Sequence, residues 1–356
     1  MKIFHCNLCR HIVFFENTVC ESCRALLGFI PEEMRMHAFD PQQEASYTSA
    51  QSGAPVTWRY CDNHQHNTCN WLIQVPSETG LCLACELNRY IPNLSNEEDH
   101  EGWRELEFAK HRLVYSLLRL KLPIHSKIRR PQKGIAFDFI DPKKQLPAGA
   151  AGMTGHSQGQ ITVTLDEADP AKREGNRVAM NERYRTLLGH LRHEIGHYYW
   201  DLLIAPDNQK LQAFRALFGD EQRNYSEALS THYRQGPTPN WRQHFISAYA
   251  SSHPWEDWAE TWAHYLHIMD ILETAYCVGL ATRPPKAEHQ AALSCAVTTD
   301  PYLENDMRPL LNTAATLSLT LNSLNRSMGL QDLYPFILTE TVKEKLIYIH
   351  RLLHPT

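Results

Sequence analysis

The pattern of apolar and polar positions changes at about residue 97 of this 356-residue chain. Before that point, the apolar stretches are short and are interrupted by cysteines. After it they become long and amphipathic: the segment WRELEFAKHRLVYSLLRL (103–120) repeats apolar residues at helical spacing, and most of 205–356 has a helical pattern. Two segments are typical of strands, GIAFDFI (134–140) and GQITVTLDEA (159–168). The pattern predicts a mainly helical α+β fold.

A longer amphipathic helix is predicted over NERYRTLLGHLRHEIGHYYWDLLI (181–204). At about 100° per residue, its apolar side chains form one continuous stripe. The stripe consists of Tyr184, Leu187, Leu188, Leu191, Ile195, Tyr198, Tyr199, Leu202 and Leu203. His193 and His197 fall roughly opposite the stripe, so we expect them to face water or a cleft. Because they are four residues apart, their side chains lie one turn above the other and can bind the same ion.

A second helix is predicted over HPWEDWAETWAHYLHIMD (253–270), where Pro254 suits a helix N-terminus. An aromatic-rich stripe covers one face, and Glu256, Glu260, His264 and His267 follow another. Two glutamates one turn apart usually belong to a solvated surface. With HEIGH upstream, we interpret this face as the source of a carboxylate ligand.

Composition and charge are those of an ordinary folded protein, with 43% hydrophobic residues, 21% charged residues and a formal net charge of −5. No apolar run approaches the roughly 18 residues that cross a bilayer, and MKIFHCNLCRHIVFFENTVC has too short an apolar stretch for a signal peptide. We therefore expect a cytoplasmic protein without a membrane partner. The acidic balance and the scarcity of basic residues in the first 95 positions disfavour nucleic acid as a partner.

The first cysteine group consists of two tight pairs, CNLC (Cys6, Cys9) and CESC (Cys20, Cys23). Two such pairs can converge on one tetrahedral Zn²⁺, which replaces a hydrophobic core that about 25 residues could not build. Two redox-active pairs are the alternative interpretation. We predict a zinc ribbon over residues 1–30, followed by a linker over 31–56.

A second cysteine group contains Cys61, Cys69, Cys82 and Cys85 and predicts another structural zinc module over residues 57–95. Only the CLAC half forms a tight pair, so the spacing is irregular. His64 and His66 lie between the first two cysteines and could replace one of them as ligand. We favour the interpretation that they are exposed loop histidines.

His193, Glu194 and His197 form a His-Glu-x-x-His motif. A catalytic zinc ion lowers the pKa of water, and a carboxylate beside it takes the proton, a role that Glu194 could fill without being a ligand. Such an ion usually has three protein ligands and one open position. A third histidine six residues after His197 is excluded because position 203 is Leu. A carboxylate from the second helix is the other solution.

The motif together with the later EDWAE resembles the gluzincin metallopeptidases. The resemblance implies that Glu256 is the third zinc ligand and that Glu260 orients a ligand histidine. Some gluzincins carry a tyrosine seven residues before the ligand glutamate, and its hydroxyl supports the developing oxyanion. Tyr249 stands at that position, with His253 and His267 as competing candidates for this role.

A narrower resemblance extends over nearly the whole chain. The cysteine pairs, CNW (69–71), TGH (154–156), YRTLLGHLRHEIGHYYW, LFGD (217–220), HPWEDWAETWAHYLH and YPF (334–336) together resemble a bacterial family of zinc-ribbon-containing zinc metallopeptidases. The resemblance implies a zincin-like metallopeptidase domain over 96–356 preceded by small zinc-ribbon modules.

These observations lead us to expect a zinc-dependent metallopeptidase that acts on a peptide or protein, with one catalytic and two structural Zn²⁺ and Glu194 as general base. The strand at 159–168 would supply an edge for an extended substrate. His156, in the loop ahead of that strand, is a candidate substrate contact, although a turn residue is the simpler interpretation. Two alternatives stay open: a non-catalytic adaptor whose zinc ribbons bind a protein or nucleic-acid partner, and a hydrolase acting on a smaller molecule. Glu194 favours hydrolysis, because a purely structural zinc site does not need it.

Overall fold

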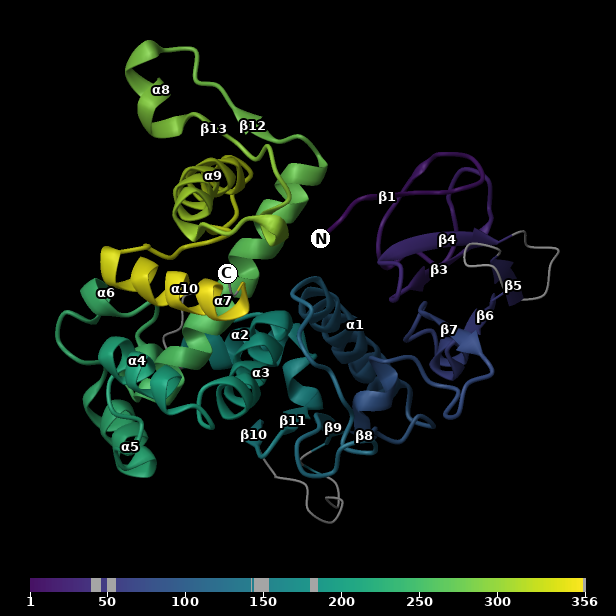
Figure 1. Ribbon diagram of the computed structural model, residues 1–356, viewed down its shortest axis with the longest axis horizontal. Helices are drawn as coiled ribbons and strands as arrows, with labels where there is room; N and C mark the ends of the chain where they lie inside the picture. Colours follow the sequence, from purple (N-terminus) through teal and green to yellow (C-terminus); the bar gives the residue numbers. More distant parts are fainter. Residues whose placement is uncertain (40–45, 50–55, 142, 144–153, 180–184, 355–356) are drawn as a thin grey trace. The chain divides into compact units, whose positions relative to one another are not determined.

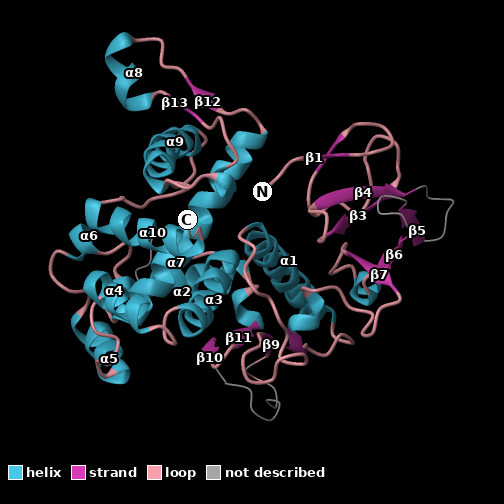
Figure 2. Ribbon diagram, in the orientation of Figure 1, coloured by secondary structure: helices cyan, strands magenta, loops and turns pink. Residues whose placement is uncertain are grey.

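The computed structural model describes residues 1–39, 46–49, 56–141, 143, 154–179 and 185–354. The chain divides into two compact units, Met1–Pro170 and Ala171–Thr356. The first unit contains most of the strands, and the second is built almost wholly of helices (Figures 1 and 2). The predicted mainly helical α+β class is confirmed. Among the described residues, no helix is long and apolar enough to cross a membrane.

The cysteine-rich part of the first unit is built from small antiparallel pieces. β1 (Phe4–His5) pairs with β2 (Ile12–Val13), β3 (Leu26–Ile30) pairs with β4 (Arg35–Phe39), and β5 (Ser46–Ser49), β6 (Val56–Tyr60) and β7 (Leu72–Val75) form a three-stranded sheet. Phe39 at the end of β4 packs in a core cluster with Ile30, Trp58, Tyr60 and Leu72. Within the linker predicted over 31–56, β4 is therefore part of a packed core, whereas residues 40–45 and 50–55 of the predicted linker lie outside the described residues.

A four-stranded sheet follows, with the order β10-β11-β9-β8. Its strands are β8 (Asn88–Tyr90), β9 (Ala136–Ile140), β10 (Gly155–Ser157) and β11 (Gln160–Thr164). β8 and β11 both run parallel to β9, and β10 is antiparallel to β11. The two strands predicted at 134–140 and 159–168 are confirmed as β9 and β11.

The prediction that residues 159–168 form a sheet edge is wrong. β11 lies between β9 and β10, because the chain folds back at Gln158 and Gly159, which both have positive φ. The Gly159 N–H donates a 2.8 Å hydrogen bond to His156 Nε2 across this turn. His156 thus has the role of a turn residue, and β10 is the strand that occupies this edge.

Helix α1 (Glu97–Arg119) belongs to the same unit and confirms the helix predicted at 103–120. It begins earlier than predicted because the Asn96 side chain accepts hydrogen bonds from the amides of Glu98 and Asp99, which is a strong N-cap. Its apolar face, including Trp103, is buried.

The second unit is organised around the long helix α7 (Pro254–Cys277), against which α3 (Leu187–Leu203) and several other helices pack (Figure 1). The remaining elements are α2 (Pro170–Ala179), α4 (Asn208–Phe218), α5 (Tyr225–Gln235), α6 (Trp241–His244), α8 (Ala287–Leu293), α9 (Met307–Ser327), α10 (Glu340–Leu353), and the short strands β12 (Ala281–Thr282) and β13 (Cys295–Ala296). The helical pattern predicted for 205–356 is confirmed.

Both helices that carry the candidate ligands begin at side-chain caps. The Thr186 side chain accepts from the Gly189 amide at the start of α3, and the His253 side chain accepts from the Trp255 amide at the start of α7. Pro254 occupies the first turn of α7, as predicted. The predicted beginning of the first helix, including Tyr184, lies outside the described residues.

Gly196 allows α3 and α7 to approach closely. A Cβ at this position would lie 3.1 Å from Ala259 Cα and 3.2 Å from Trp262 Cβ, so a larger residue would push the helices apart. The Trp258 indole N–H donates a 2.8 Å hydrogen bond to the Gly196 carbonyl. Trp262 stacks on Tyr199, with 5.1 Å between ring centroids. This packing brings the polar face of α7 against the histidines of α3.

Candidate functional site

His193, His197 and Glu256 meet where α3 packs on α7. His193 Nε2 lies 3.0 Å from Glu256 Oε2, and His197 Nε2 lies 3.6 Å from Glu256 Oε1. One ligand atom from each of the three residues can be chosen so that all lie within 4.8 Å of one another. The two histidines are 8% and 3% exposed. Of the two expected surroundings, water or a cleft, a water-exposed face is therefore wrong, because the acidic face of α7 lies over both histidines.

This donor set fits a zinc ion. Two imidazole nitrogens and one carboxylate oxygen are the protein ligands of many catalytic zinc sites. Glu256 Oε2 is buried and has no hydrogen-bond partner among the described residues, although His193 Nε2 is close. A buried carboxylate oxygen without a donor is costly, and a cation between the three side chains would remove that cost.

Glu260 fixes the orientation of His193. The Nδ1 atom of His193 lies 2.8 Å from Glu260 Oε1, and the Ser247 hydroxyl donates a 2.5 Å hydrogen bond to Glu260 Oε2. When His193 Nδ1 donates to Glu260, the lone pair of Nε2 faces Glu256, as a metal ligand requires. Sequence reasoning missed Ser247, which carries no motif of its own.

The electrostatics of the cluster favour a cation. Burial opposes ionisation of Glu256, but the neighbouring His197 and His193 rings and the hydroxyl of Tyr225 lower its pKa to about 2. Burial alone would lower the pKa of His193, yet Glu256 and Glu260 raise it well above its usual value. The two carboxylates thus attract positive charge to the His193 ring, and a metal ion would experience the same attraction.

Glu194 is buried beside the ligand cluster without belonging to it. Its Oε1 atom lies 3.3 Å from Nε2 of His190, one turn earlier on α3. Burial raises the pKa of Glu194, but His190 and the charge of His193 outweigh this effect and leave the pKa below its usual value. The carboxylate is therefore ionised near neutral pH and can accept a proton.

Two tyrosines border the cluster. Tyr249 lies in the short 3₁₀ helix Tyr249–Ser251, with its ring centroid 5.9 Å from that of His193. Burial and the charge of Glu256 raise its pKa, so its hydroxyl keeps the proton and can donate. The Tyr225 hydroxyl, from α5, donates a 2.7 Å hydrogen bond to Glu256 Oε1. Sequence reasoning missed Tyr225, because only the tertiary fold brings α5 to the start of α7.

The histidines that compete with Tyr249 make other contacts. His253 caps α7 through Nδ1, which accepts from the Trp255 amide, and its Nε2 lies 3.1 Å from the Arg223 carbonyl oxygen. His267 Nδ1 lies 2.6 Å from an Arg192 guanidinium nitrogen.

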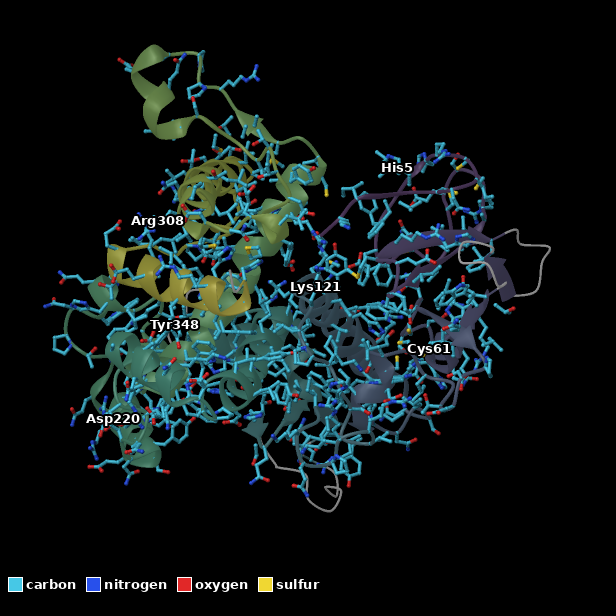
Figure 3. The ribbon with its side chains drawn as sticks, viewed as in Figure 1. His5, Cys61, Lys121, Asp220, Arg308 and Tyr348 are labelled. Atoms are coloured by element: carbon cyan, nitrogen blue, oxygen red, sulfur yellow. The ribbon has the colours of Figure 1, made fainter. Side chains whose placement is uncertain are left out.

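The cysteines gather into two groups of four. Cys6 Sγ and Cys23 Sγ lie 3.7 Å apart, as do Cys69 Sγ and Cys82 Sγ, so the close contacts join cysteines of different pairs. Four sulfurs around an ion at about 2.3 Å are separated by about 3.8 Å in a tetrahedron. Both groups therefore fit one tetrahedral ion each. Figure 3 shows sulfur atoms gathered beside the labelled Cys61.

His64 and His66 do not join the second cysteine group in the described structure. His64 Nδ1 lies 2.8 Å from the Cys69 carbonyl oxygen, and its ring stacks on Tyr60 at 3.8 Å. Another histidine, His111 from α1, comes closer, with Nε2 3.8 Å from Cys85 Sγ and 4.0 Å from Cys82 Sγ. No spacing rule connects His111 with these cysteines, and sequence reasoning missed it.

Comparison with known proteins shows the families to which the two parts of the chain are similar. The model of a family described as "Putative zinc-binding metallo-peptidase" matches residues 99–352, and that of a family described as "zinc-ribbon domain" matches residues 3–96. One uncharacterized protein of Mycobacterium bovis and two of Mycobacterium tuberculosis are each 40% identical to this chain over 350 residues, which is 98% of this chain and 94% of each relative. No solved structure was found to match the chain. The predicted order of a zinc ribbon followed by a peptidase domain is confirmed.

Proposed function

Since this chain belongs to the family described as "Putative zinc-binding metallo-peptidase", we propose that it is a gluzincin-type enzyme that hydrolyses peptide bonds in a peptide or protein substrate. The observation that carries the proposal is the convergence of His193, His197 and Glu256, in which a buried carboxylate oxygen has no hydrogen-bond donor among the described residues. We assign these three side chains as the ligands of one catalytic zinc ion.

When bound, Zn²⁺ supplies a Lewis acid that polarises the scissile carbonyl and lowers the pKa of water. Glu194 accepts a proton from the attacking water at a carboxylate oxygen and later donates it to the leaving amine nitrogen, while the carbon–nitrogen bond breaks. Tyr249 donates a hydrogen bond from its hydroxyl to the oxygen on which negative charge develops. Glu260 and Ser247 hold the His193 ring in place.

We further propose two structural zinc ions, one for each cysteine group. The first would belong to a module of residues 1–30 and the second to a module of residues 57–95, with the peptidase domain over 96–356. Ligand sets made only of thiolates are typical of structural zinc and leave no open position for substrate.

Replacing Glu194 by Gln tests the proposed chemistry. The amide keeps the shape of the side chain but cannot accept the proton, so we expect hydrolysis of a peptide library to fall by roughly 10²–10⁴-fold. Zinc content should stay at three ions per chain, since Glu194 is not a ligand. Glu344→Gln, at an exposed position of α10, is the matched control and should cleave normally.

Two results would oppose the proposal. Unchanged turnover in Glu194→Gln would remove the assigned general base. Two tightly held ions and no third in the native protein would instead favour the adaptor function, in which the cysteine groups are the only zinc sites.

A further inference from the structure

We infer that Tyr225 is a positioning residue that makes Glu256 bind the catalytic metal through one oxygen only, Oε2. The inference rests on the ligand set proposed above and adds a residue from a different helix to it. Tyr225 does not coordinate the ion itself in this proposal; it acts through the carboxylate that does.

The two oxygens of Glu256 have different surroundings. Oε1 accepts a 2.7 Å hydrogen bond from the Tyr225 hydroxyl. Oε2 has no hydrogen-bond partner among the described residues and lies 3.0 Å from His193 Nε2. Oε1 also lies 3.6 Å from His197 Nε2, but it already accepts the tyrosine hydrogen bond, so Oε2 is the oxygen with both lone pairs available to a cation. A glutamate that binds through one oxygen leaves more of the coordination sphere open, which a catalytic site needs for water and substrate.

The Tyr225 side chain is held in place from the side of α7. Its ring packs edge-on against His253, with 5.2 Å between centroids, and against Trp255 at 5.9 Å. His253 Nε2 also lies within 3.1 Å of the Arg223 carbonyl oxygen, just before α5. The start of α5 is thereby tied to the start of α7, one turn from the proposed ligand, so the hydroxyl has a fixed relation to Glu256.

Core packing does not explain this tyrosine. Helix α5 contributes no buried residue, and Tyr225 itself is 38% exposed. Its hydroxyl instead contacts Glu256, which is 1% exposed. Loss of that hydroxyl alone should therefore affect the metal site much more than the fold.

Tyr225→Phe removes the hydroxyl and keeps the ring. On the full-length protein with both cysteine sites loaded, we expect the Kd of the third zinc ion to rise by about 10-fold to 100-fold, measured by competition with a chromophoric chelator. The visible spectrum of Co²⁺ in this site should also change, because the second oxygen of Glu256 becomes free to bind. Circular dichroism and thermal unfolding of the variant without the third ion should match those of the native protein in the same state.

Ser230→Ala is the matched control, because it removes an exposed hydroxyl from the same helix. Its zinc affinity and Co²⁺ spectrum should equal those of the native protein. Equal losses in both variants would overturn the inference, since they would reflect a general effect on α5.

Glu256→Gln separates this inference from the proposed function. If Glu256→Gln and Tyr225→Phe both weaken the third ion, the inference is supported. If only Glu256→Gln weakens it and Tyr225→Phe stays within twofold of native, the inference is overturned and the ligand set survives. If Glu256→Gln binds the ion as tightly as the native protein, the ligand set fails and the inference fails with it.

Discussion

Replacing Lys345 by Met would test whether the helix that carries Glu256 is held by a buried ion pair from the end of the chain. Lys345 on α10 is 2% exposed. Its ammonium group donates to Asp257 Oδ2 at 2.6 Å and to the His244 carbonyl at 2.8 Å. Asp257 follows Glu256 directly in α7 and is fully buried. Loss of the cation would thus act on the backbone beside the proposed ligand.

The expected cost follows from what the substitution leaves behind. Met fills most of the volume of the lysine, so little packing is lost, but at a pH above the pKa of Asp257 this residue remains as a buried carboxylate without its counter-charge. Removing one partner of a buried ion pair typically costs about 3–5 kcal/mol. Since folded domains are stable by only about 5–15 kcal/mol, this change would remove a large part of the free energy of unfolding.

The loss in free energy of unfolding caused by Lys345→Met should depend on pH. Burial raises the pKa of Asp257 from 3.8 to about 7, although Lys345 lowers it. A carboxyl group whose pKa is higher in the folded protein binds more protons there, so its contribution to stability falls as pH rises from about 4 to about 7. Without Lys345 the pKa should rise further and extend this loss above pH 7. We therefore expect a larger stability difference between variant and native protein at about pH 8 than at about pH 5.

Urea unfolding followed by tryptophan fluorescence at both pH values measures these differences. Asp257→Asn combined with Lys345→Met should recover most of the stability, because no unpaired charge remains. Lys343→Met on the same helix breaks only a surface pair with Glu340 and should cost about 0–1 kcal/mol. A cost below about 1 kcal/mol for Lys345→Met at both pH values would refute this reasoning.

Three further predictions concern the metal site. Gly196→Ala should cost about 1–3 kcal/mol in urea unfolding and weaken the third zinc ion, because the added methyl group meets α7; normal stability would contradict the close packing. Glu260→Gln should raise the Kd of that ion by about 10-fold to 100-fold in chelator competition while the cysteine sites stay loaded, and an unchanged Kd would show that Glu260 does not support His193. Tyr249→Phe should lower kcat by roughly 10²–10³-fold with zinc content unchanged, and a normal kcat would exclude it as an oxyanion donor.

Local patterns predicted the elements that carry the site. The helical period of apolar residues located α1, α3 and α7, and the alternation of apolar and polar residues at 159–168 located β11. Each of these two patterns depends only on which face of a single element is buried. Two tight cysteine pairs predicted the first group of four, and one tight pair with Cys61 and Cys69 nearby predicted the second, since the spacing within a tight pair limits how its thiols can be arranged.

Features that depend on a second element could not be predicted in this way. A helical wheel placed His193 and His197 opposite the apolar stripe and so toward water or a cleft, but it could not show that Glu256 and Glu260 would cover them. The hydroxyl of Tyr225 and that of Ser247 reach the cluster from separate segments, with no motif to connect them. The position of β11 inside its sheet depends on β10 folding back.

The packing of α3 on α7 explains why a polar cluster can exist in this interior. Buried aromatic contacts such as Tyr199 on Trp262, together with the absence of a side chain at Gly196, set the distance between the two helices. At that distance the acidic face of α7 must lie against His193 and His197, whether or not a metal is bound. The free energy of hydrophobic packing thus offsets the unfavourable free energy of burying these charges together, and a bound cation would lower that unfavourable term. Adding zinc should therefore raise the melting temperature of the native chain by more than it raises the melting temperature of the Glu256→Gln variant.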